Sequence, residues 1–492
     1  MLKQVFSQQK GPEPQTDSSS IKLEDGAHVA VMGGGPTGSF FSFFLLDMAE
    51  RMGMDLQVDI YEPRDFSLPA PRGCNKCAGV ISESLVQNLA MEGINLPPSV
   101  VRRGVDSYVL HTDVGSVRLE TPMLEKRIGA MYRGAGPRGT KEFKWESFDG
   151  HLLSLAEKKG ARVINARVKD VERTDGRLLV KARTNSSKIY DLLVVATGVN
   201  STAHKMFESQ ELEFKSPQTT KTAILEYFLG AEAIDKYMGS SLHVFLLDIP
   251  KLEFAMTVPK GDYVTVCLLG HDIDTNLLQT CLNAPEVKQC FPPGWQWDQN
   301  VCQCLPRINV RGAIQPYADR MVFVGDIGTS RLYKDGIGAA YKAAKAAAST
   351  AIFWGISAQD FKRHYWPTCN TMKYDNKFGR VVFAVTRLIQ RTRLARKAVL
   401  RMAAREQRKG NSPPRMSSVL WDTFTGSAPY QDIFLRTLHP AFLSRLGWDL
   451  ATSLVVDNRL FTKFSKEKDN GIRRIGQNIS GWGSHHPPGR SG

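Results

Sequence analysis

Residues 28–38 read His-Val-Ala-Val-Met-Gly-Gly-Gly-Pro-Thr-Gly, a short β-branched run that leads directly into a Gly-x-Gly-x-x-Gly pattern. A helical pattern follows, and a second apolar run ends at the acidic residue Glu62. In such a strand–turn–helix, Gly33 permits the tight turn, Gly35 lets the backbone approach a diphosphate, and Gly38 lets helix and strand pack closely. The helix N-terminus offers N–H groups to phosphates, and Glu62 would accept hydrogen bonds from a ribose. The stretch predicts the opening β-α-β of a dinucleotide-binding fold; the alternative is a plain glycine turn before a core helix.

The length and composition of the chain are those of a globular protein. A chain of 492 residues is too long for one simple core, so two or three sub-domains are expected. Eight cysteines do not indicate a disulfide scaffold, no signal peptide is evident, and no run of 18 or more apolar residues is present. We therefore expect a soluble protein of the reducing cytoplasm. Residues 1–26 are polar and are predicted to be disordered.

The net charge of +15 is concentrated in one segment, between Lys377 and Lys409, where eleven Lys and Arg residues accompany a single acid. Apolar and basic residues recur there at helical spacing: Val381, Val385, Leu388 and Ile389, and Lys397, Arg401 and Arg405. A basic amphipathic helix suits an anionic membrane surface, an acidic substrate or nucleic acid, whereas a plainer interpretation is a solvated helix that packs one face on the protein. Because no nucleic-acid motif is present, we expect no nucleic-acid partner.

Two further segments carry signals of a bound dinucleotide. A predicted hairpin, 166–171 and 177–182, precedes an apolar strand that ends in Ala196-Thr197-Gly198, where small residues let the chain pass close to a ligand. The β-run 321–324 ends in Gly325-Asp326, and Gly336-Ile337-Gly338 then leads into an alanine-rich helix over 339–351. An aspartate at such a strand end can hold the ribityl chain of a flavin, and the helix N-terminus can face the pyrimidine edge of the ring. Lys334 is either a further positive charge at that edge or a surface lysine.

The order of these three motifs resembles that of the para-hydroxybenzoate hydroxylase-like flavoproteins. The resemblance implies FAD as the cofactor and an α/β fold class. The expected architecture is a discontinuous, three-layer ββα Rossmann-like FAD-binding domain, an inserted and mostly antiparallel β-sheet substrate domain, and a helical C-terminal region. The expected boundaries are 27–110, 150–215 and 310–355 for the FAD-binding domain, 111–149 and 216–309 for the substrate domain, 356–465 for the basic helical region, and 466–492 for a flexible tail.

Within that superfamily the chain most resembles the geranylgeranyl reductase family. Cys77 and Gly79 match a Cys-x-Gly element that lies beside the flavin in that family, and Pro259-Lys260-Gly261-Asp262 matches a second element. The resemblance implies hydride transfer from reduced flavin to a C=C bond of an apolar substrate, isoprenoid in that family. Phe254, Met256 and Val258 replace the family's Tyr, Trp and Phe, so a substrate cavity of different shape is expected there.

The sequence also departs from the family in its contacts to FAD. The usual arginine of an Arg-x-x-Phe-Asp element is absent, since Lys144 and Trp145 precede Phe148-Asp149; Arg133 or Arg138 would have to replace it. The resemblance and the motifs together give these candidate cofactor-binding residues: Gly33, Gly35, Pro36, Gly38, Glu62, Arg64, Cys77, Ala78, Gly79, Arg133, Ala196, Thr197, Gly198, Gly325, Asp326, Gly336, Ile337 and Gly338. Cys77 is the candidate catalytic residue, as a proton donor.

Three alternatives stay open for the pair Cys74-x-x-Cys77: a zinc or Fe–S ligand pair, a redox-active dithiol, or simple packing. Cys302-x-Cys304 is the only other close pair, and its spacing is poor for zinc; the ten histidines show no ligand spacing. We therefore predict no metal site.

Three functions remain open from the sequence. They are a flavin-dependent reductase, an FAD-dependent monooxygenase or halogenase-like enzyme acting on an aromatic or apolar small molecule, and a protein that binds a membrane surface or a partner through its basic helix. For the enzymes, the electron donor would be NAD(P)H, a ferredoxin or a quinol. No obligate protein partner can be inferred. Beyond residue 356 we expect a turn and short helix around Trp421–Phe434, and an amphipathic helix over 440–456 that uses Leu443, Leu446, Leu450 and Leu454.

Overall fold

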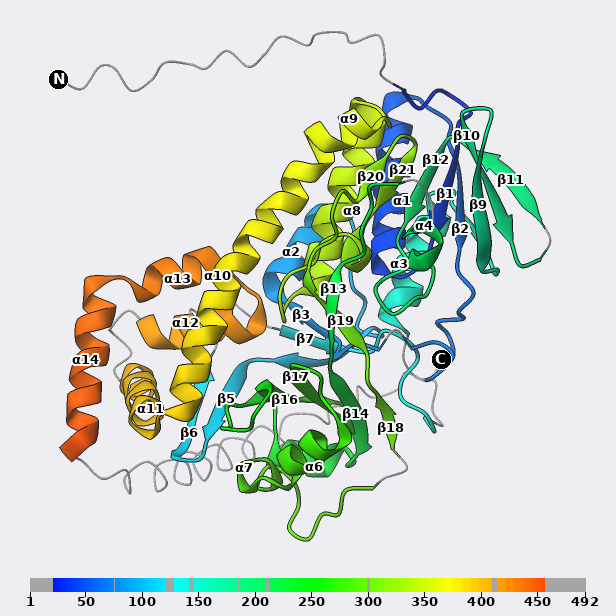
Figure 1. Cartoon of the computed structure of the whole chain (residues 1–492). Coiled ribbons are helices and arrows are strands. Elements are labelled where there is room, and N and C mark those ends of the chain that lie inside the picture. Colours follow the sequence, from blue (N-terminus) through cyan, green and yellow to red (C-terminus); the bar gives the residue numbers. More distant parts are fainter. Residues whose placement is uncertain are drawn as a thin grey trace, which may run out of the picture. The chain divides into compact units, whose positions relative to one another are not determined.

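The computed structural model describes most of the chain and separates it into two compact units (Figure 1). The described residues are 21–74, 76–120, 128–140, 146–184, 186–208, 212–298, 301–408 and 414–455. Unit 1 comprises Met1–Asn75, Arg133–Thr220 and Arg307–Tyr374; unit 2 comprises Lys76–Tyr132, Lys221–Pro306 and Asp375–Gly492. The predicted disordered segment up to residue 20, Lys144 and Trp145, and the predicted flexible tail lie outside the described residues.

The centre of unit 1 is a sheet with the strand order β20-β21-β12-β1-β2-β8. Strand β1 (His28–Met32) runs parallel to both of its neighbours, β2 (Gln57–Tyr61) and β12 (Leu192–Val195). These strands read as nearly continuous apolar runs because both faces of the sheet are covered. The remaining strands of this sheet are β8 (Arg162–Ile164), β20 (Tyr317–Ala318) and β21 (Met321–Phe323).

Helices cover one face of this sheet, and a small antiparallel sheet covers the other, which is the predicted three-layer arrangement (Figure 1). The helices are α1 (Pro36–Met52), α3 (Phe148–Lys158) and α8 (Gly336–Phe353). The alanine-rich face of α8 lets α1 approach closely, and Phe40 and Phe44 pack edge-on against Tyr341 at 5.8 and 5.6 Å between ring centroids. The antiparallel strands are β9 (Val168–Thr174), β10 (Arg177–Ala182) and β11 (Ser187–Tyr190).

The predicted hairpin is therefore present as β9 and β10, and its turn uses Asp175 and Gly176 at positive φ. The segment 21–26 is packed rather than disordered: Leu23 is buried, and the amide of Ile356 donates to the carbonyl of Ile21 at 2.6 Å. Unit 1 also contains several short elements. They are α4 (His204–Glu208), β13 (Gln218–Lys221), β19 (Arg307–Arg311), η2 (Gly325–Ile327), α9 (Ala358–Asp360) and η3 (Phe361–Tyr365).

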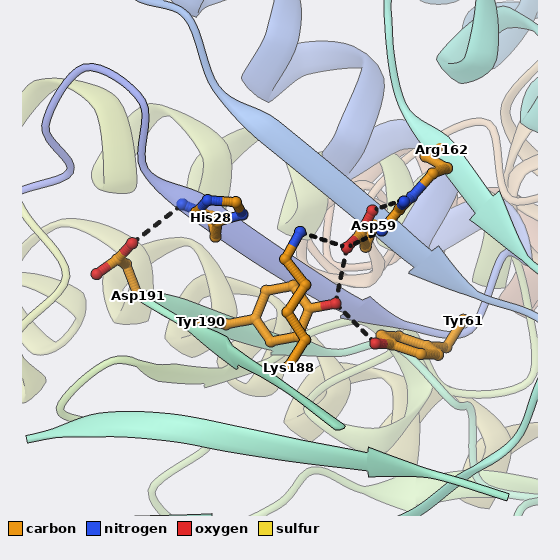
Figure 2. A network of polar contacts seen from close by, with 7 residues as sticks. All are labelled: His28, Asp59, Tyr61, Arg162, Lys188, Tyr190 and Asp191. Atoms are coloured by element: carbon orange, nitrogen blue, oxygen red, sulfur yellow. Dashed lines mark hydrogen bonds and ion pairs between the residues drawn. The ribbon is translucent and has the colours of Figure 1, made fainter. Parts of the chain in front are cut away.

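A polar network centred on Asp59 joins β2 to the antiparallel layer (Figure 2). The buried carboxylate accepts two hydrogen bonds from Arg162 (2.8 and 2.9 Å), one from Tyr190 (2.7 Å) and one from Lys188 (3.1 Å). The hydroxyl groups of Tyr190 and Tyr61 also share a 2.7 Å hydrogen bond. Burial acts to raise the pKa of Asp59, but the hydrogen bonds from Arg162, Tyr190 and Lys188 outweigh it and hold that pKa below its ordinary value.

Unit 2 is built on a mostly antiparallel sheet with the order β18-β14-β17-β16-β15-β5-β6, as predicted for an inserted β domain. Its strands are β5 (Ser107–Thr112), β6 (Gly115–Glu120), β14 (Ala223–Phe228), β15 (Ser241–Phe245), β16 (Leu252–Lys260), β17 (Tyr263–Gly270) and β18 (Cys302–Cys304). A smaller sheet has the order β3-β7-β4, with β3 (Val80–Ser82), β4 (Val101–Val105) and β7 (Ile128–Met131). Four helices accompany these sheets: α2 (Glu83–Met91), α5 (Ala231–Tyr237), α6 (Thr275–Asn283) and α7 (Pro285–Lys288).

The chain after residue 365 is helical, as expected, but its helices bury other residues than predicted. They are α10 (Trp366–Arg391), α11 (Arg393–Arg408), α12 (Arg415–Thr425), α13 (Tyr430–Thr437) and α14 (Pro440–Val455). Trp421 to Thr425 form the end of helix α12 rather than a turn, and Gly426 caps that helix in the left-handed conformation. In α14 the buried residues are Phe442, Asp449 and Ser453, whereas Leu443 and Leu454 are exposed.

Within the part of the chain that the structure describes, no helix is both long enough and apolar enough to cross a membrane.

The units differ from the expected domain boundaries in several places. The expected C-terminal region is not separate, since residues 356–374 belong to unit 1 and residues from 375 onward to unit 2, and residues 216–220 and 307–309 belong to unit 1. Residues 76–110 belong to unit 2, because β3 and β4 pair with β7. Residues 133–149 belong to unit 1, where Arg133 forms an ion pair with Asp149 at the start of α3.

Candidate functional site

The turn between β1 and α1 has the geometry that the glycine pattern predicts. Gly33 adopts a φ of +105°, and its amide donates to the carbonyl of Tyr61 at 2.9 Å. A Cβ atom on Gly33 would lie 2.7 Å from the carbonyl oxygen of Ala196, and one on Gly38 would lie 1.9 Å from that of Gly33. Side chains at either position would separate β1 from its neighbours, so only glycine fits.

The N-terminus of α1 is built without a side-chain cap. Gly35 is the N-cap residue, with extended backbone and no side-chain hydrogen bond, and Pro36 occupies the first turn. The first turn contains no acidic residue either. The positive end of the helix dipole is therefore offered to an outside anion rather than neutralised by the chain itself.

Glu62 lies directly after β2 and is fixed against this turn. One carboxylate oxygen accepts from the amide of Gly34 and the other from the amide of Arg64, both at 2.9 Å. Burial raises the pKa of Glu62 above its usual value, although these hydrogen bonds and the charge of Arg64 act in the opposite direction. The acidic group expected to contact a ribose is thus at the end of the second strand, beside the glycine turn.

Two more predicted segments reach the same edge of the sheet. Thr197 follows β12, and its hydroxyl is buried without a hydrogen-bond partner among the described residues. Gly325 follows β21 with a φ of +75°, and a Cβ atom on it would lie 2.2 Å from the hydroxyl oxygen of Thr37 at the start of α1. Gly198, which follows Thr197, also has a positive φ, of +67°. Because β1, β2, β12 and β21 are parallel, their carboxyl ends bring these segments together.

The charge of Arg133 acts on two carboxylates, those of Asp149 and Asp326. Burial raises the pKa of Asp326, while a hydrogen bond from Ser330 and the charge of Arg133 oppose that rise. Arg133 also makes a bidentate ion pair with the buried Asp149, at 2.6 and 2.8 Å. Arg133, one of the two arginines expected to replace the missing family arginine, therefore pairs with Asp149 and acts on Asp326 through its charge.

The start of α8 carries its own acidic cap. Asp335, at a φ of +49°, accepts from the amide of Gly338 at 3.2 Å and forms a 2.7 Å ion pair with Arg331. Gly336 lies near Asp326, since a Cβ atom on it would be 4.0 Å from that carboxylate, and Ile337 is buried. Lys334 is buried, which argues against its interpretation as a surface lysine.

The residues of unit 1 thus fit an adenine–flavin dinucleotide by the chemistry they present. The uncapped N-terminus of α1 suits the diphosphate, and the carboxylates of Glu62 and Asp326 suit the hydroxyl groups of the ribose and the ribityl chain. The hydroxyl of Thr197, which has no partner among the described residues, can donate a hydrogen bond to the ligand. The other predicted residues, Cys77, Ala78 and Gly79 together with the three cavity residues, belong to unit 2.

Within unit 2 the structure brings together the two elements that resemble the reductase family. Gly79 has a φ of +67°, and a Cβ atom on it would lie 2.0 Å from the carbonyl oxygen of Met131 and 3.1 Å from Nζ of Lys260. The half-buried thiol of Cys77 accepts from the amide of Gly79 at 3.4 Å. The Cys-x-Gly segment and the Pro-Lys-Gly-Asp strand are therefore in contact through Gly79 and Lys260.

Lys260 belongs to a buried polar cluster that sequence reasoning did not find. Its ammonium group is fully buried, 3.6 Å from the carboxylate of Glu226 and 4.5 Å from the ring centroid of Tyr132. Glu226 also accepts from the hydroxyl of Thr265 at 2.8 Å. Burial raises the pKa of Glu226 even beside Lys260, and it raises that of Tyr132 well above its usual value. The only sequence signal for this cluster was Lys260 itself, within a recognised element.

The predicted cavity residues lie on one strand, β16, and are all buried. Phe254 is covered by aromatic residues of the C-terminal helices, with ring centroids 6.0 Å from Phe383 of α10 and 5.1 Å from Phe424 of α12. Met256 and Val258 share its face of the strand, since side chains two residues apart point the same way. Helices α10 and α12 thus cover the strand face at Phe254.

The cysteines form no disulfide in the described parts of the chain. Cys74 belongs to unit 1 and Cys77 to unit 2, and neither is part of a group of potential metal ligands within the described ranges.

No protein-family model matches the sequence, and no curated protein matches it either. Solved structures do match. Halogenase PltM in complex with phloroglucinol and FAD aligns with a TM-score of 0.55 at 10% identity, covering 86% of this chain and 96% of that chain. A flavoprotein/dehydrogenase from Cytophaga hutchinsonii gives 0.54 at 12% identity (87% and 100%), and p-nitrophenol 4-monooxygenase PnpA from Pseudomonas putida DLL-E4 gives 0.53 at 14% identity (82% and 100%). At these identities the likeness establishes the fold: a mixed α/β chain with a parallel sheet, antiparallel sheets and a helical C-terminal region, as in FAD-binding monooxygenases.

Proposed function

We propose that the chain is an FAD-dependent oxidoreductase whose cofactor is held by unit 1. The observation that carries the proposal is the edge where four parallel strands end, because it combines a glycine turn, an uncapped helix N-terminus, buried carboxylates and an unpartnered hydroxyl. The halogenase PltM, which has the same fold, was solved with FAD, and this supports the choice of cofactor.

Each group in unit 1 has a role in this proposal. The amides at the start of α1 bind the diphosphate, the carboxylate of Glu62 accepts from the ribose hydroxyls, and Asp326 accepts from the ribityl chain. Arg133 holds Asp149 in a bidentate ion pair, and its charge acts against the rise in the pKa of Asp326. The main-chain amides of Gly336 and Ile337, at the start of α8, would donate to the flavin, beside the amide of Gly338 that Asp335 already caps. Bound FAD supplies the hydride chemistry, and the protein orients it and excludes water.

The reaction that we favour is reduction of a C=C bond in an apolar substrate. Its support is the contact between the two family-like elements at Gly79 and Lys260, together with the apolar strand face of β16. Cys77 would deliver the proton that the substrate carbon requires, and Lys260 with Glu226 would position that part of the chain. NAD(P)H or a ferredoxin would supply the electrons.

Aromatic or apolar hydroxylation is the rival reaction, and the monooxygenase and halogenase names among the structures of the same fold support it at least as well. Two measurements separate the reactions. Chemically reduced protein mixed anaerobically with prenyl lipids should be reoxidised only by a reductase. NAD(P)H oxidation with oxygen uptake, stimulated by a phenol, would instead favour the monooxygenase. For the reductase, Cys77→Ser should lower turnover by about a hundredfold without loss of flavin.

The experiment that tests the cofactor itself is substitution of Gly35 by aspartate. Asp is a good N-cap residue, so the helix should form, but its carboxylate would occupy the position of the diphosphate and repel it. Wild-type protein should show flavin absorption bands near about 370 and 450 nm, and the Gly35→Asp protein should not. Gly447→Ala, in the exposed part of α14, is the control and should retain flavin. A fully loaded Gly35→Asp protein, or wild type that takes up no FAD, would refute the proposal.

We further propose that α10 contacts an anionic membrane surface. Val381, Val385 and Leu388 are 44%, 51% and 64% exposed and form a stripe on one side of this helix, with Lys377 and Arg380 exposed beside it. Such a stripe suits shallow insertion at a lipid headgroup region.

Wild type should sediment with anionic vesicles and not with zwitterionic ones. The double variant Val385→Glu, Leu388→Glu should stay in solution, whereas Leu305→Gln, at another exposed site of unit 2, should still sediment; equal sedimentation of both variants would rule the contact out.

A further inference from the structure

Three potential metal ligands from separate parts of the sequence meet inside unit 2. His111 lies in β5, His243 lies in the neighbouring strand β15, and Cys290 follows α7; all three are buried. Nε2 of His111 is 2.9 Å from Nδ1 of His243, and the sulfur of Cys290 is 3.3 Å from that Nδ1 and 3.7 Å from that Nε2. The three atoms form a triangle that no part of the proposed flavin site uses.

The size of this triangle suits one metal ion. A point equidistant from the three atoms lies about 1.9 Å from each, against typical zinc bonds of about 2.0 Å to nitrogen and 2.3 Å to sulfur. Tetrahedral zinc would hold the nitrogens about 3.3 Å apart and each about 3.6 Å from the sulfur. The observed separations differ from these by a few tenths of an ångström, so rotation of the two rings is enough to admit the ion.

The protonation of the three groups also suits a cation. Burial lowers the pKa of His111 and of His243, which favours the neutral imidazole that has a lone pair for a metal. Burial raises the pKa of the Cys290 thiol to about 12, so the thiol keeps its proton until a metal displaces it. Two neutral imidazoles and one thiolate are ligands that zinc prefers.

Gln289 lies behind His111. Its side-chain amide nitrogen is 3.2 Å from Nδ1 of His111, the ring nitrogen that would face away from the ion, so a metal-bound His111, which carries its proton on Nδ1, requires the amide of Gln289 to turn its oxygen toward the ring. An acceptor behind the ring orients a metal-bound imidazole. Gln289 also lines an open pocket with Lys288, Trp295 and Trp297.

We propose that His111, His243 and Cys290 bind one Zn²⁺ ion, with water as the fourth ligand. The ion would fasten strands β5 and β15 to the segment after α7, so its role is to stabilise unit 2. Binding forms one Zn–S and two Zn–N bonds and breaks the S–H bond of Cys290; the proton goes to the buffer, and no electron is transferred. The sequence alone predicted no metal site in this chain, and this proposal departs from that prediction.

Metal titration of the full chain tests the site. Protein stripped with a chelator should bind one equivalent of Zn²⁺, and calorimetry in buffers of different ionisation enthalpy should show release of about one proton per ion. Co²⁺ as a spectroscopic substitute should give a sulfur-to-cobalt charge-transfer band and the visible spectrum of a tetrahedral site.

Cys290→Ser should abolish that band and the bound equivalent, and His111→Gln should weaken binding at least a hundredfold. Cys281→Ser is the matched control, because Cys281 is also buried in unit 2 with a pKa raised to about 12 but lies in α6, outside the group. Wild type that binds no Zn²⁺, or a charge-transfer band that survives in Cys290→Ser, would overturn the proposal. So would binding of Cu⁺ with no uptake of Zn²⁺. The wild-type titration decides even if a variant fails to fold.

Discussion

Gly38 shows how a single missing side chain controls unit 1. A methyl group there would meet the carbonyl oxygen of Gly33 at 1.9 Å, a backbone atom that cannot move without opening the β1–α1 turn. We expect Gly38→Ala to lower the free energy of unfolding by about 3 kcal/mol or more and to abolish flavin uptake. Gly447→Ala changes another helical glycine, one with open space around it, and should stabilise α14 by about 0.5–1 kcal/mol. Denaturant unfolding of both variants would contradict this if their midpoints moved alike.

Asp59 gives a prediction about pH. Its folded-state pKa is lowered, so its stabilising effect is present above the unfolded value of 3.8 and is lost as the pH falls through the folded value. Asp59→Asn should therefore cost about 2 kcal/mol at neutral pH, and the difference from wild type should shrink in acid below about pH 4. Asp175→Asn, in the exposed turn of the hairpin, is the control and should show no such dependence. A constant difference between pH 7 and pH 3 would mean that the charge of Asp59 is not what stabilises the network.

Site residues that lie close together in the sequence were predictable, whereas those that meet only through the tertiary fold were not. The glycines at 33 and 38 and Glu62 follow from sequence because turn, helix and strand end are set within a few tens of residues. Lys260 and Glu226, or His111 and Cys290, lie far apart in sequence and meet only through sheet pairing, so spacing alone carried no sign of them.

At the scale of the element, α14 shows the limit of periodicity. Leu443 and Leu454 have helical spacing yet are exposed, and the helix is held instead by the ion pair of Arg405 in α11 with the buried Asp449, at 2.7 Å. The basic residues at 401 and 405 thus face a neighbouring helix rather than a membrane. Periodicity identified the helix but could not choose its buried face, because that choice depends on a partner from elsewhere in the chain.

Removal of Arg405 should loosen α14. Arg405→Ala leaves a fully buried carboxylate with one partner fewer, which should cost about 1–3 kcal/mol and speed amide hydrogen exchange in α14. Arg393→Ala, at the exposed start of α11, should leave that exchange unchanged. If α14 exchanged equally in both variants, the ion pair would not be what holds it.

For the whole molecule, the class and layers of the fold were predictable but the boundaries of its units were not. The order of three motifs was enough to predict a discontinuous dinucleotide-binding domain. The assignment of 76–110 failed because β3 and β4 pair with β7, which begins at Ile128, after both of them in the chain, and no local sequence pattern indicates that pairing.

The two proposed ligands should stabilise different units. FAD at about 100 times its dissociation constant should add about 2.7 kcal/mol and slow hydrogen exchange in β1, α1, β12 and α8. Zn²⁺ should slow exchange in β5, β15 and α7 instead. Hydrogen exchange measured by mass spectrometry with FAD alone and with Zn²⁺ alone makes each ligand the control for the other. Protection of the same peptides by both ligands would contradict the assignment of separate sites.

The chain passes between the two units five times, and this matters while the protein is being synthesised. The passages are at residues 75/76, 132/133, 220/221, 306/307 and 374/375. The ribosome completes α1 nearly three hundred residues before it adds Tyr341 of α8, so at 5–20 residues per second the aromatic face of α1 waits about 15 to 60 s for its last partner. Over that interval Phe40 and Phe44 lack the cover of Tyr341. The newborn polypeptide should therefore be a client of chaperones, and neither half of the molecule can be expressed as a simple truncation.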